Sequence, residues 1–234
     1  MLQELLSIFR GDDPLSKVAD DFALMLNLTR EMTYSSGQIF FGEDHDENAQ
    51  DKVHKADAEV NELERTIRRA LMTHLSIPGN SVDAPYSLLL MSLVKDVERL
   101  GDYAKNLSEI VEIGPKTLPE GQELNELLMI RRKVELVYQA CANVVLSSRH
   151  GEAAELIRQG RETARRCDSL VAAIGQSTYD ATTTTAFILA TRYYKRINAH
   201  VLNVLSSVVM PLDKVDYYDD GAVNEASGSD NCPP

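Results

Sequence analysis

The sequence predicts an all-α protein built as a tandem of two three-helix bundles. Six long segments carry apolar residues at intervals of three and four, the spacing that gives a helix one buried face. Most of the breaks between the segments carry Gly or Pro, which interrupt helices. Aromatic residues make up 6% of the chain and Trp is absent, which fits an Ala, Leu and Val core between helices better than a β-sandwich.

The first three expected helices span residues 14–40, 47–75 and 83–112. The first starts at Asp12-Asp13-Pro14, which offers an acidic N-cap and a Pro in the first turn. The second ends at a Pro-Gly pair and the third ends before a Gly-Pro pair. Their expected inward-facing residues are Leu15, Val18, Phe22 and Met25, then Val53, Ala56, Val60, Leu63, Ile67 and Ala70, then Leu90, Leu93, Val97, Leu100, Ala104, Leu107 and Val111.

The last three expected helices span residues 119–147, 151–174 and 180–209. Residues 182–185 are four consecutive Thr, which are poor helix formers. The apolar spacing that follows them nevertheless favours a helix. The expected inward-facing residues are Leu127, Ile130, Val134, Val137, Cys141 and Val144, then Ile157, Ala164, Cys167, Val171 and Ile174, then Phe187, Ala190, Tyr194, Ile197, Val201, Val204 and Val208.

The domain boundary is expected at the Pro/Gly-rich break that has three helices on each side. This places a first bundle at residues 1–114 and a second bundle at 115–212. Residues 213–234 carry six acidic residues against one Lys, together with Gly, Ser and Pro. Such a composition cannot bury a core, so we expect a disordered acidic tail.

An internal repeat links the two halves. An offset of 97 residues brings the apolar stripe of the sixth helix onto that of the third. Any two helices of the same period can be aligned in this way, but Arg196 also falls on Arg99 and Asn203 on Asn106. We interpret the halves as diverged copies of one bundle, with helices crossing at roughly 20°.

The composition excludes several classes of function. The chain has 234 residues and a net charge of −12. This charge argues against nucleic-acid binding, because phosphate contacts need clustered Lys and Arg. No apolar run reaches the roughly 18 residues of a membrane-spanning helix, so we expect no direct membrane insertion.

The cysteines and the N-terminus suggest a cytoplasmic protein. Cys141, Cys167 and Cys232 are odd in number and widely spaced, which suits neither a disulfide framework nor a zinc site. The first two lie on apolar stripes and are expected to be small core residues. The N-terminus has neither the basic leader nor the cleavage site of a signal peptide.

One face of the third helix carries the residues best suited to chemistry. Glu98, Asp102 and Asn106 recur every four residues, so their oxygen atoms line one face. We expect both carboxylates to point outward or sideways. Two carboxylates one turn apart repel each other unless a cation lies between them, and oxygen ligands suit hard or borderline metal ions. The alternative is a solvated acidic face with Lys95 and Arg99 as neighbours.

Residues 98–107, Glu-Arg-Leu-Gly-Asp-Tyr-Ala-Lys-Asn-Leu, resemble the signature of the PhoU-domain family, the phosphate-uptake regulators. In that family the segment lies on the third helix of each three-helix bundle. The resemblance covers about residues 13–210 by architecture, and its motifs occur only in the first half. The preceding helix also follows the family pattern, through Val53, Asp57, Val60, Asn61, Leu63 and Glu64.

The resemblance implies a metal site on the first bundle. Some members of the family hold multinuclear iron or other metal clusters through E(D)-x-x-x-D motifs. Glu98 and Asp102 fit this motif, and Asp57 is the expected contribution of the neighbouring helix. Glu47 and Asp51 have the same spacing but rank lower. The expected metal is iron, or else zinc, manganese or magnesium, and the alternative is no cofactor.

The second half departs from the family pattern. Lys195 stands where the motif has Glu, Asn198 where it has Gly, and Ala199 where it has Asp. An ammonium group repels cations and Ala has no ligand atom, so we expect no metal cluster on the second bundle. His200 is a candidate ligand, although a lone His on a helix is more often structural.

The resemblance implies a non-enzymatic regulator of phosphate uptake or phosphate signalling. Its implied partners are a phosphate ABC transporter and a phosphate-sensing histidine kinase, and a homodimer is left open. One alternative is a helical interaction or scaffold protein without metal. Another is a carboxylate-bridged metal enzyme, which is disfavoured because none of the five His lies three residues after a Glu. A phosphate-binding loop and a nucleophile motif are also absent, so we expect no enzymatic activity.

Overall fold

The computed structural model describes residues 16–210 and residue 215. Its six long helices confirm the all-α prediction, and the described residues contain no strand. All the expected helix ends that fall in this part of the chain lie within three residues of the observed ones. The helices are α2 (Ser16–Phe41), α3 (Ala49–Leu75), α4 (Ala84–Glu109), α5 (Gln122–Ser147), α6 (His150–Gly175) and α7 (Ala181–Val209), and the short 3₁₀ helices η1 (Asn80–Asp83) and η2 (Ile110–Glu112) flank α4.

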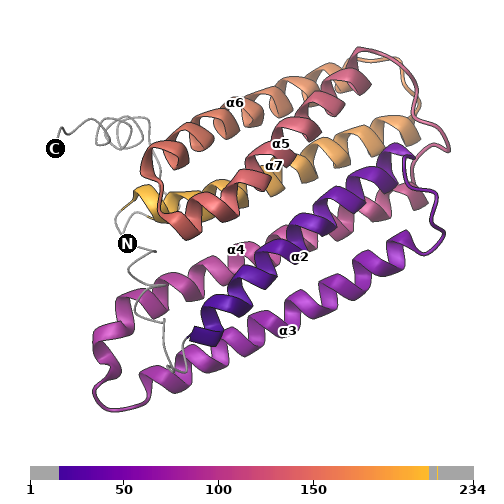
Figure 1. Cartoon of the computed structure of the whole chain (residues 1–234). Helices are drawn as coiled ribbons and strands as arrows, with labels where there is room; N and C mark the ends of the chain where they lie inside the picture. Colours follow the sequence, from indigo (N-terminus) through magenta and orange to yellow (C-terminus); the bar gives the residue numbers. More distant parts are fainter. Residues whose placement is uncertain (1–15, 211–214, 216–234) are drawn as a thin grey trace.

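The helices form two three-helix bundles, as predicted. Figure 1 shows α2, α3 and α4 packed as one bundle and α5, α6 and α7 as the other. The bundles meet mainly along α4 and α7, with a smaller contact between α2 and α5. The buried apolar residues of both bundles form one continuous core. The division of the chain into two separately folding domains at residue 114 stays a prediction.

The contact between α4 and α7 has the pattern of a two-fold axis. Tyr103 and His200, which the 97-residue offset relates, stack with ring centroids 5.6 Å apart. On one side of this stack His200 contacts Asp96. On the other side Tyr103 lies 6.2 Å from Tyr193, the counterpart of Asp96 under the same offset. The His200–Asp96 contact and the Tyr103–Tyr193 contact thus join equivalent positions, with α4 and α7 exchanged. The two bundles are therefore related as two copies of one unit would be.

The start of α7 explains why four consecutive Thr residues form a helix. Asp180 is the N-cap, and its carboxylate accepts hydrogen bonds from the backbone N–H groups of Thr182 and Thr183 at 2.8 and 3.0 Å. The hydroxyl of Thr183 donates to the same carboxylate at 2.8 Å. These bonds occupy N–H groups that a first helical turn leaves without partners.

One expected core position in the described residues is wrong. Val111 is 43% exposed, because α4 ends at Glu109 and the tighter 3₁₀ turn that follows changes the direction of the side chains. Five other expected core residues are only partly buried, namely Ala56, Leu63 and Ala70 on α3 and Ala164 and Val171 on α6. The expected helix start at Asp12-Asp13-Pro14 lies outside the described residues. So does the expected acidic tail apart from Val215, which packs against the core.

None of the helices in the described ranges is long and apolar enough to cross a bilayer.

Candidate functional site

The three predicted metal-ligating residues lie along the seam between α3 and α4. Glu98 and Asp102 lie one turn apart on α4, and Asp57 lies on α3. Asp57 and Glu98 are each only 8% exposed. Glu98 therefore points sideways into the seam rather than outward to solvent. Asp102 is more open, with a quarter of its side chain exposed.

Glu98 is neutralised by its neighbours on α4. Lys95 donates a hydrogen bond to its carboxylate at 2.6 Å, and the Arg99 Nε lies 3.7 Å away. The same Lys95 ammonium lies 3.9 Å from Glu64 of α3. Glu64 in turn pairs with Arg68 one turn later, at 3.1 Å.

The remaining two carboxylates share one ammonium group. Lys105 donates to Asp57 across the seam at 2.8 Å and lies 3.9 Å from Asp102. Arg99 donates to Asp102 at 2.7 Å. The amide of Asn61 lies at the limit of hydrogen-bonding distance from Asp57, at 3.5 Å. Every predicted ligand residue is thus paired with a cation of the chain itself.

Together these contacts form a continuous row of alternating charges, which we call the charge ladder. Four carboxylates alternate with four cationic groups, so the row is electrically balanced inside an acidic protein. The spacing of three and four residues along each helix is the one that places opposite charges side by side. The members of the charge ladder are Arg68, Glu64, Lys95, Glu98, Arg99, Asp102, Lys105 and Asp57.

Lys105 remains an ammonium group at neutral pH. Burial lowers the pKa of Lys105, but the hydrogen bond to Asp57 and the charges of Asp57, Asp102 and Glu109 outweigh this effect. The pKa of Lys105 is therefore raised above its ordinary value. The position between Asp57 and Asp102 consequently holds a positive charge throughout the physiological pH range.

This arrangement does not fit a metal ion. Within the part of the chain that the structure describes, no three His, Cys, Asp or Glu side chains lie close enough together to hold one. Asp57, Glu98 and Asp102 each face a Lys or Arg, and the point that Asp57 and Asp102 share is occupied by the Lys105 ammonium group. The lower-ranked Glu47 and Asp51 are exposed near the start of α3.

The second bundle uses the equivalent positions differently. Lys195, in the place of Glu98, pairs with Asp168 of α6 at 2.6 Å. His200 lies 2.6 Å from Asp96, which also accepts a hydrogen bond from Asn203 at 2.9 Å. His200 therefore takes part in the contact between the bundles.

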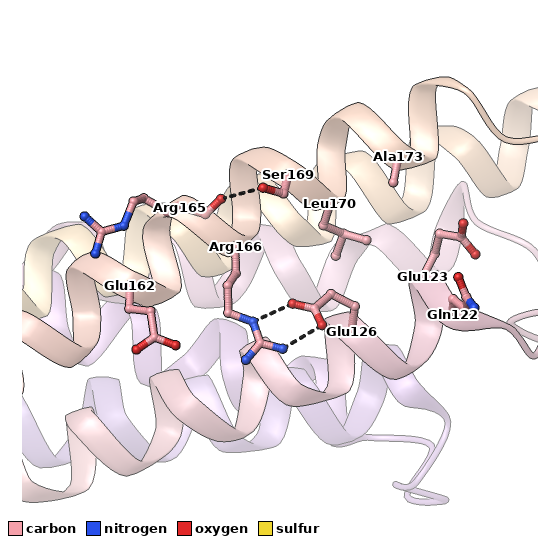
Figure 2. A pocket seen from close by; sticks show the side chains of 9 residues that line it. All are labelled: Gln122, Glu123, Glu126, Glu162, Arg165, Arg166, Ser169, Leu170 and Ala173. Carbon is pink, nitrogen blue, oxygen red and sulfur yellow. Dashed lines mark hydrogen bonds and ion pairs between the residues drawn. The ribbon is translucent and has the colours of Figure 1, made fainter.

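The repeat also produces two matching surface hollows. One lies between α5 and α6 and has a volume of about 380 Å³. In this hollow the Arg166 guanidinium makes a bidentate pair with the Glu126 carboxylate (Figure 2). The other lies between α2 and α3 and measures about 370 Å³. The two hollows are lined at equivalent positions of α3 and α6, which an offset of 100 residues relates. On α3 these positions are Thr66, Arg69, Ala70 and Thr73. On α6 they are Arg166, Ser169, Leu170 and Ala173.

The sequence reasoning missed two residues of these sites. Lys105 lies three residues after Asp102, a spacing that does indicate an ion pair, but nothing in the sequence shows that it reaches Asp57 of another helix. Asp96 is 7% exposed and joins the bundles. Its spacing on α4 predicts no such contact.

Comparison with known proteins supports the resemblance noted from the sequence. Residues 22–111, which span most of α2 and all of α3 and α4, match the family model of the PhoU domain. This stretch contains all eight members of the charge ladder. The resemblance to the PhoU-domain family is thus confirmed, at the motif level, for the first bundle.

Two crystal structures share the fold of the chain. PhoU from Pseudomonas aeruginosa superposes with a TM-score of 0.71 at 19% identity, covering 84% of this chain and 95% of the other. The phosphate transport system regulatory protein PhoU from Streptococcus pneumoniae superposes with a TM-score of 0.74 at 15% identity, covering 88% of this chain and 97% of the other. Both bundles are therefore included in the common fold. A comparison with curated proteins finds no match.

Proposed function

We propose that this chain, whose first bundle is a PhoU domain, is a non-enzymatic regulator of phosphate uptake or phosphate signalling. The observation that carries the proposal is the family match over residues 22–111. The shared fold of the Streptococcus pneumoniae protein, a phosphate transport system regulatory protein, supports it across both bundles. The protein acts in the cytoplasm by binding other proteins.

The chemistry of the described residues supports a role without catalysis. The carboxylates of the charge ladder are all paired with cations. Burial raises the pKa of the Cys141 and Cys167 thiols to about 12. Neither thiol therefore supplies a thiolate nucleophile at neutral pH.

The proposed partners are a phosphate ABC transporter and a phosphate-sensing histidine kinase. The net charge of −12 favours partners with basic surfaces, because opposite charges speed encounter and exclude wrong partners. Purified protein is titrated against the cytoplasmic parts of the transporter and of the kinase from the same organism. Saturable binding to at least one is expected, and it should weaken as the salt concentration rises.

A deletion strain tests the function itself. Phosphate uptake and the transcription of phosphate-starvation genes are measured in phosphate-rich medium with and without the gene. We expect both to rise on deletion and to fall again when the gene is restored. If neither changes and neither partner binds, the alternative of a helical scaffold unconnected with phosphate replaces this proposal.

The metal binding that the resemblance implies for Glu98, Asp102 and Asp57 is untested, and the pairing of all three carboxylates with Lys or Arg argues against it. A homodimer also stays a prediction. Elemental analysis of protein purified without a metal-affinity column tests the first, beside the Glu98→Ala/Asp102→Ala variant. Light scattering on the same sample gives the molar mass, and a value twice that of the 26.0 kDa chain indicates a dimer.

A further inference from the structure

The two lysines of the charge ladder occupy equivalent positions between α3 and α4. Lys105 contacts Asp57 of α3 at 2.8 Å and Asp102 of α4 at 3.9 Å. Lys95 contacts Glu64 of α3 at 3.9 Å and Glu98 of α4 at 2.6 Å. Each ammonium group therefore bridges one carboxylate from each helix, as a bridging cation would.

The carboxylates need such a bridge because they are shielded from water. The side chains of Asp57, Glu64 and Glu98 are only 10–13% exposed, whereas those of Lys95 and Lys105 are 42% and 27% exposed. A carboxylate that is withdrawn from solvent is costly unless a positive charge compensates it. The lysines lie over the carboxylates and provide this compensation from the solvent side.

We propose that Lys95 and Lys105 are built-in counter-ions, which stand in the place of bound metal ions on the seam between α3 and α4. The first bundle then folds without a metal. A metal ion added from solution binds only by displacing an ammonium group, which costs both the ion pair and the repulsion between like charges.

The second bundle provides a matched control. Lys133 pairs with Glu162 and Lys195 pairs with Asp168, at 2.8 and 2.6 Å. Both lysines also join neighbouring helices, but neither bridges two carboxylates among the contacts of the described residues. Removing them leaves single carboxylates that are about half exposed, which are weak ligands for a metal ion.

The experiment compares full-length wild type with the Lys95→Gln/Lys105→Gln and Lys133→Gln/Lys195→Gln variants. Gln keeps part of the aliphatic stem and removes the charge. Circular dichroism first establishes that each variant is folded. Mn²⁺ binding is then measured by calorimetry, and the melting temperature is measured with Mn²⁺ and with EDTA. If the double variant of the ladder does not fold, the two single variants replace it.

We expect the wild-type protein to contain no bound metal. Its melting temperature should be the same with and without EDTA. The Lys95→Gln/Lys105→Gln variant should bind Mn²⁺ at least about tenfold more tightly than wild type, because a positive charge a few ångströms from the ion is removed. Mn²⁺ should raise its melting temperature, and the control variant should behave as wild type does.

Two results would overturn the proposal. The first is stoichiometric metal in wild type that disappears in a Glu98→Gln/Asp102→Asn variant, since the carboxylates would then hold a metal beside the lysines. The second is a folded ladder variant that binds Mn²⁺ no better than the control variant, since the lysines would then not be what excludes the ion. Neither result depends on the phosphate proposal, which is judged by partner binding and by the deletion strain.

Discussion

Asp96 is a buried acidic residue whose partners both belong to the other bundle. Its carboxylate lies 2.6 Å from His200 Nδ1 and accepts a hydrogen bond from Asn203 at 2.9 Å. With 7% of the residue exposed, water cannot replace these partners fully. This single side chain therefore links α4 to α7. On the other side of the pseudo-two-fold axis, the equivalent position is Tyr193, which contacts Tyr103.

Replacing Asp96 with Ala should destabilise the protein by about 1–3 kcal/mol. The change leaves the donors of Asn203 and His200 without a buried acceptor. Urea unfolding followed by circular dichroism measures the loss. Glu59→Ala, at an exposed position of α3, is the control and should shift stability by less than about 0.5 kcal/mol. Equal stabilities for the two variants would show that the buried contact contributes nothing.

Gly160 allows α6 and α7 to approach closely. A Cβ atom at this position would lie 2.5 and 2.9 Å from the two Cδ atoms of Leu202. The Asn198 amide also donates to the Gly160 carbonyl at 2.9 Å. A side chain at Gly160 would therefore force the buried Leu202 side chain to move.

Gly160→Ala should destabilise by about 1–3 kcal/mol through overpacking against Leu202. Gly175→Ala is the matched control on the same helix, because a Cβ atom added at Gly175 would have no atom within 4 Å. The control should be neutral or slightly stabilising, since Ala favours helix more than Gly does. Thermal melts of both variants test the pair, and a Gly160→Ala variant as stable as wild type would mean that Leu202 moves aside without cost.

At the scale of elements, the first turn of α7 depends on its N-cap, and the charged side of α4 depends on α3. Helix α7 begins with residues of low helix propensity, which Asp180 supports by accepting two backbone hydrogen bonds. Helix α4 carries an acidic and a basic residue alternately along one side, and α3 supplies the opposite half of each lysine bridge. The first turn of α7 is thus supported by a residue next to it in the sequence, whereas the charged side of α4 needs residues of α3.

The contribution of the Asp180 cap should vanish at low pH. The backbone N–H of Thr183 and its hydroxyl lower the pKa of Asp180 below the ordinary value of 3.8. Because the pKa is lowered, the charged cap stabilises the fold fully at pH values above 3.8. This stabilisation is lost as the pH falls through the folded-state pKa. Wild type should melt above Asp180→Ala at pH 7, and the gap should narrow as the pH falls below 3.8 and through the folded-state pKa. A gap that is constant with pH would contradict a role for the charged cap.

At the scale of the whole molecule, two repeated bundles share one core. The α4–α7 contact and the Thr29–Tyr138 hydrogen bond of 2.6 Å between α2 and α5 both cross the boundary. Tyr138 is fully buried, and burial raises the pKa of its hydroxyl far above the ordinary value. Each bundle on its own would expose these contacts to water.

The two bundles should therefore unfold together in one transition. Tyr signals report tertiary packing, because the chain has nine Tyr and no Trp, and far-ultraviolet circular dichroism reports helix content. In urea the two curves should coincide, as for a two-state domain. Two separate transitions would instead show that the boundary predicted at residue 114 divides independently stable domains.

Much of the fold could be predicted because helices depend on local sequence. The apolar intervals and the Pro and Gly breaks defined six helices, and the 97-residue offset identified the repeat that the Tyr103–His200 stack now displays. The misplaced Val111 shows the limit of this reasoning, because a change from α to 3₁₀ winding redirects a side chain without changing the spacing of apolar residues. The candidate site was harder to predict, since its Glu98 and Asp102 were identified while their partners were not.

The sequence by itself determined the helices, their grouping into two bundles, and the residues of the motif on α4. Helical periodicity and ion pairs three or four residues apart are properties of a single helix, so they can be predicted from the sequence. Only the tertiary structure decided that Lys105 reaches Asp57, that Lys95 reaches Glu64, and that Asp96 joins His200. Those contacts depend on how α3, α4 and α7 are rotated and shifted against one another, which is set by the packing of the whole core.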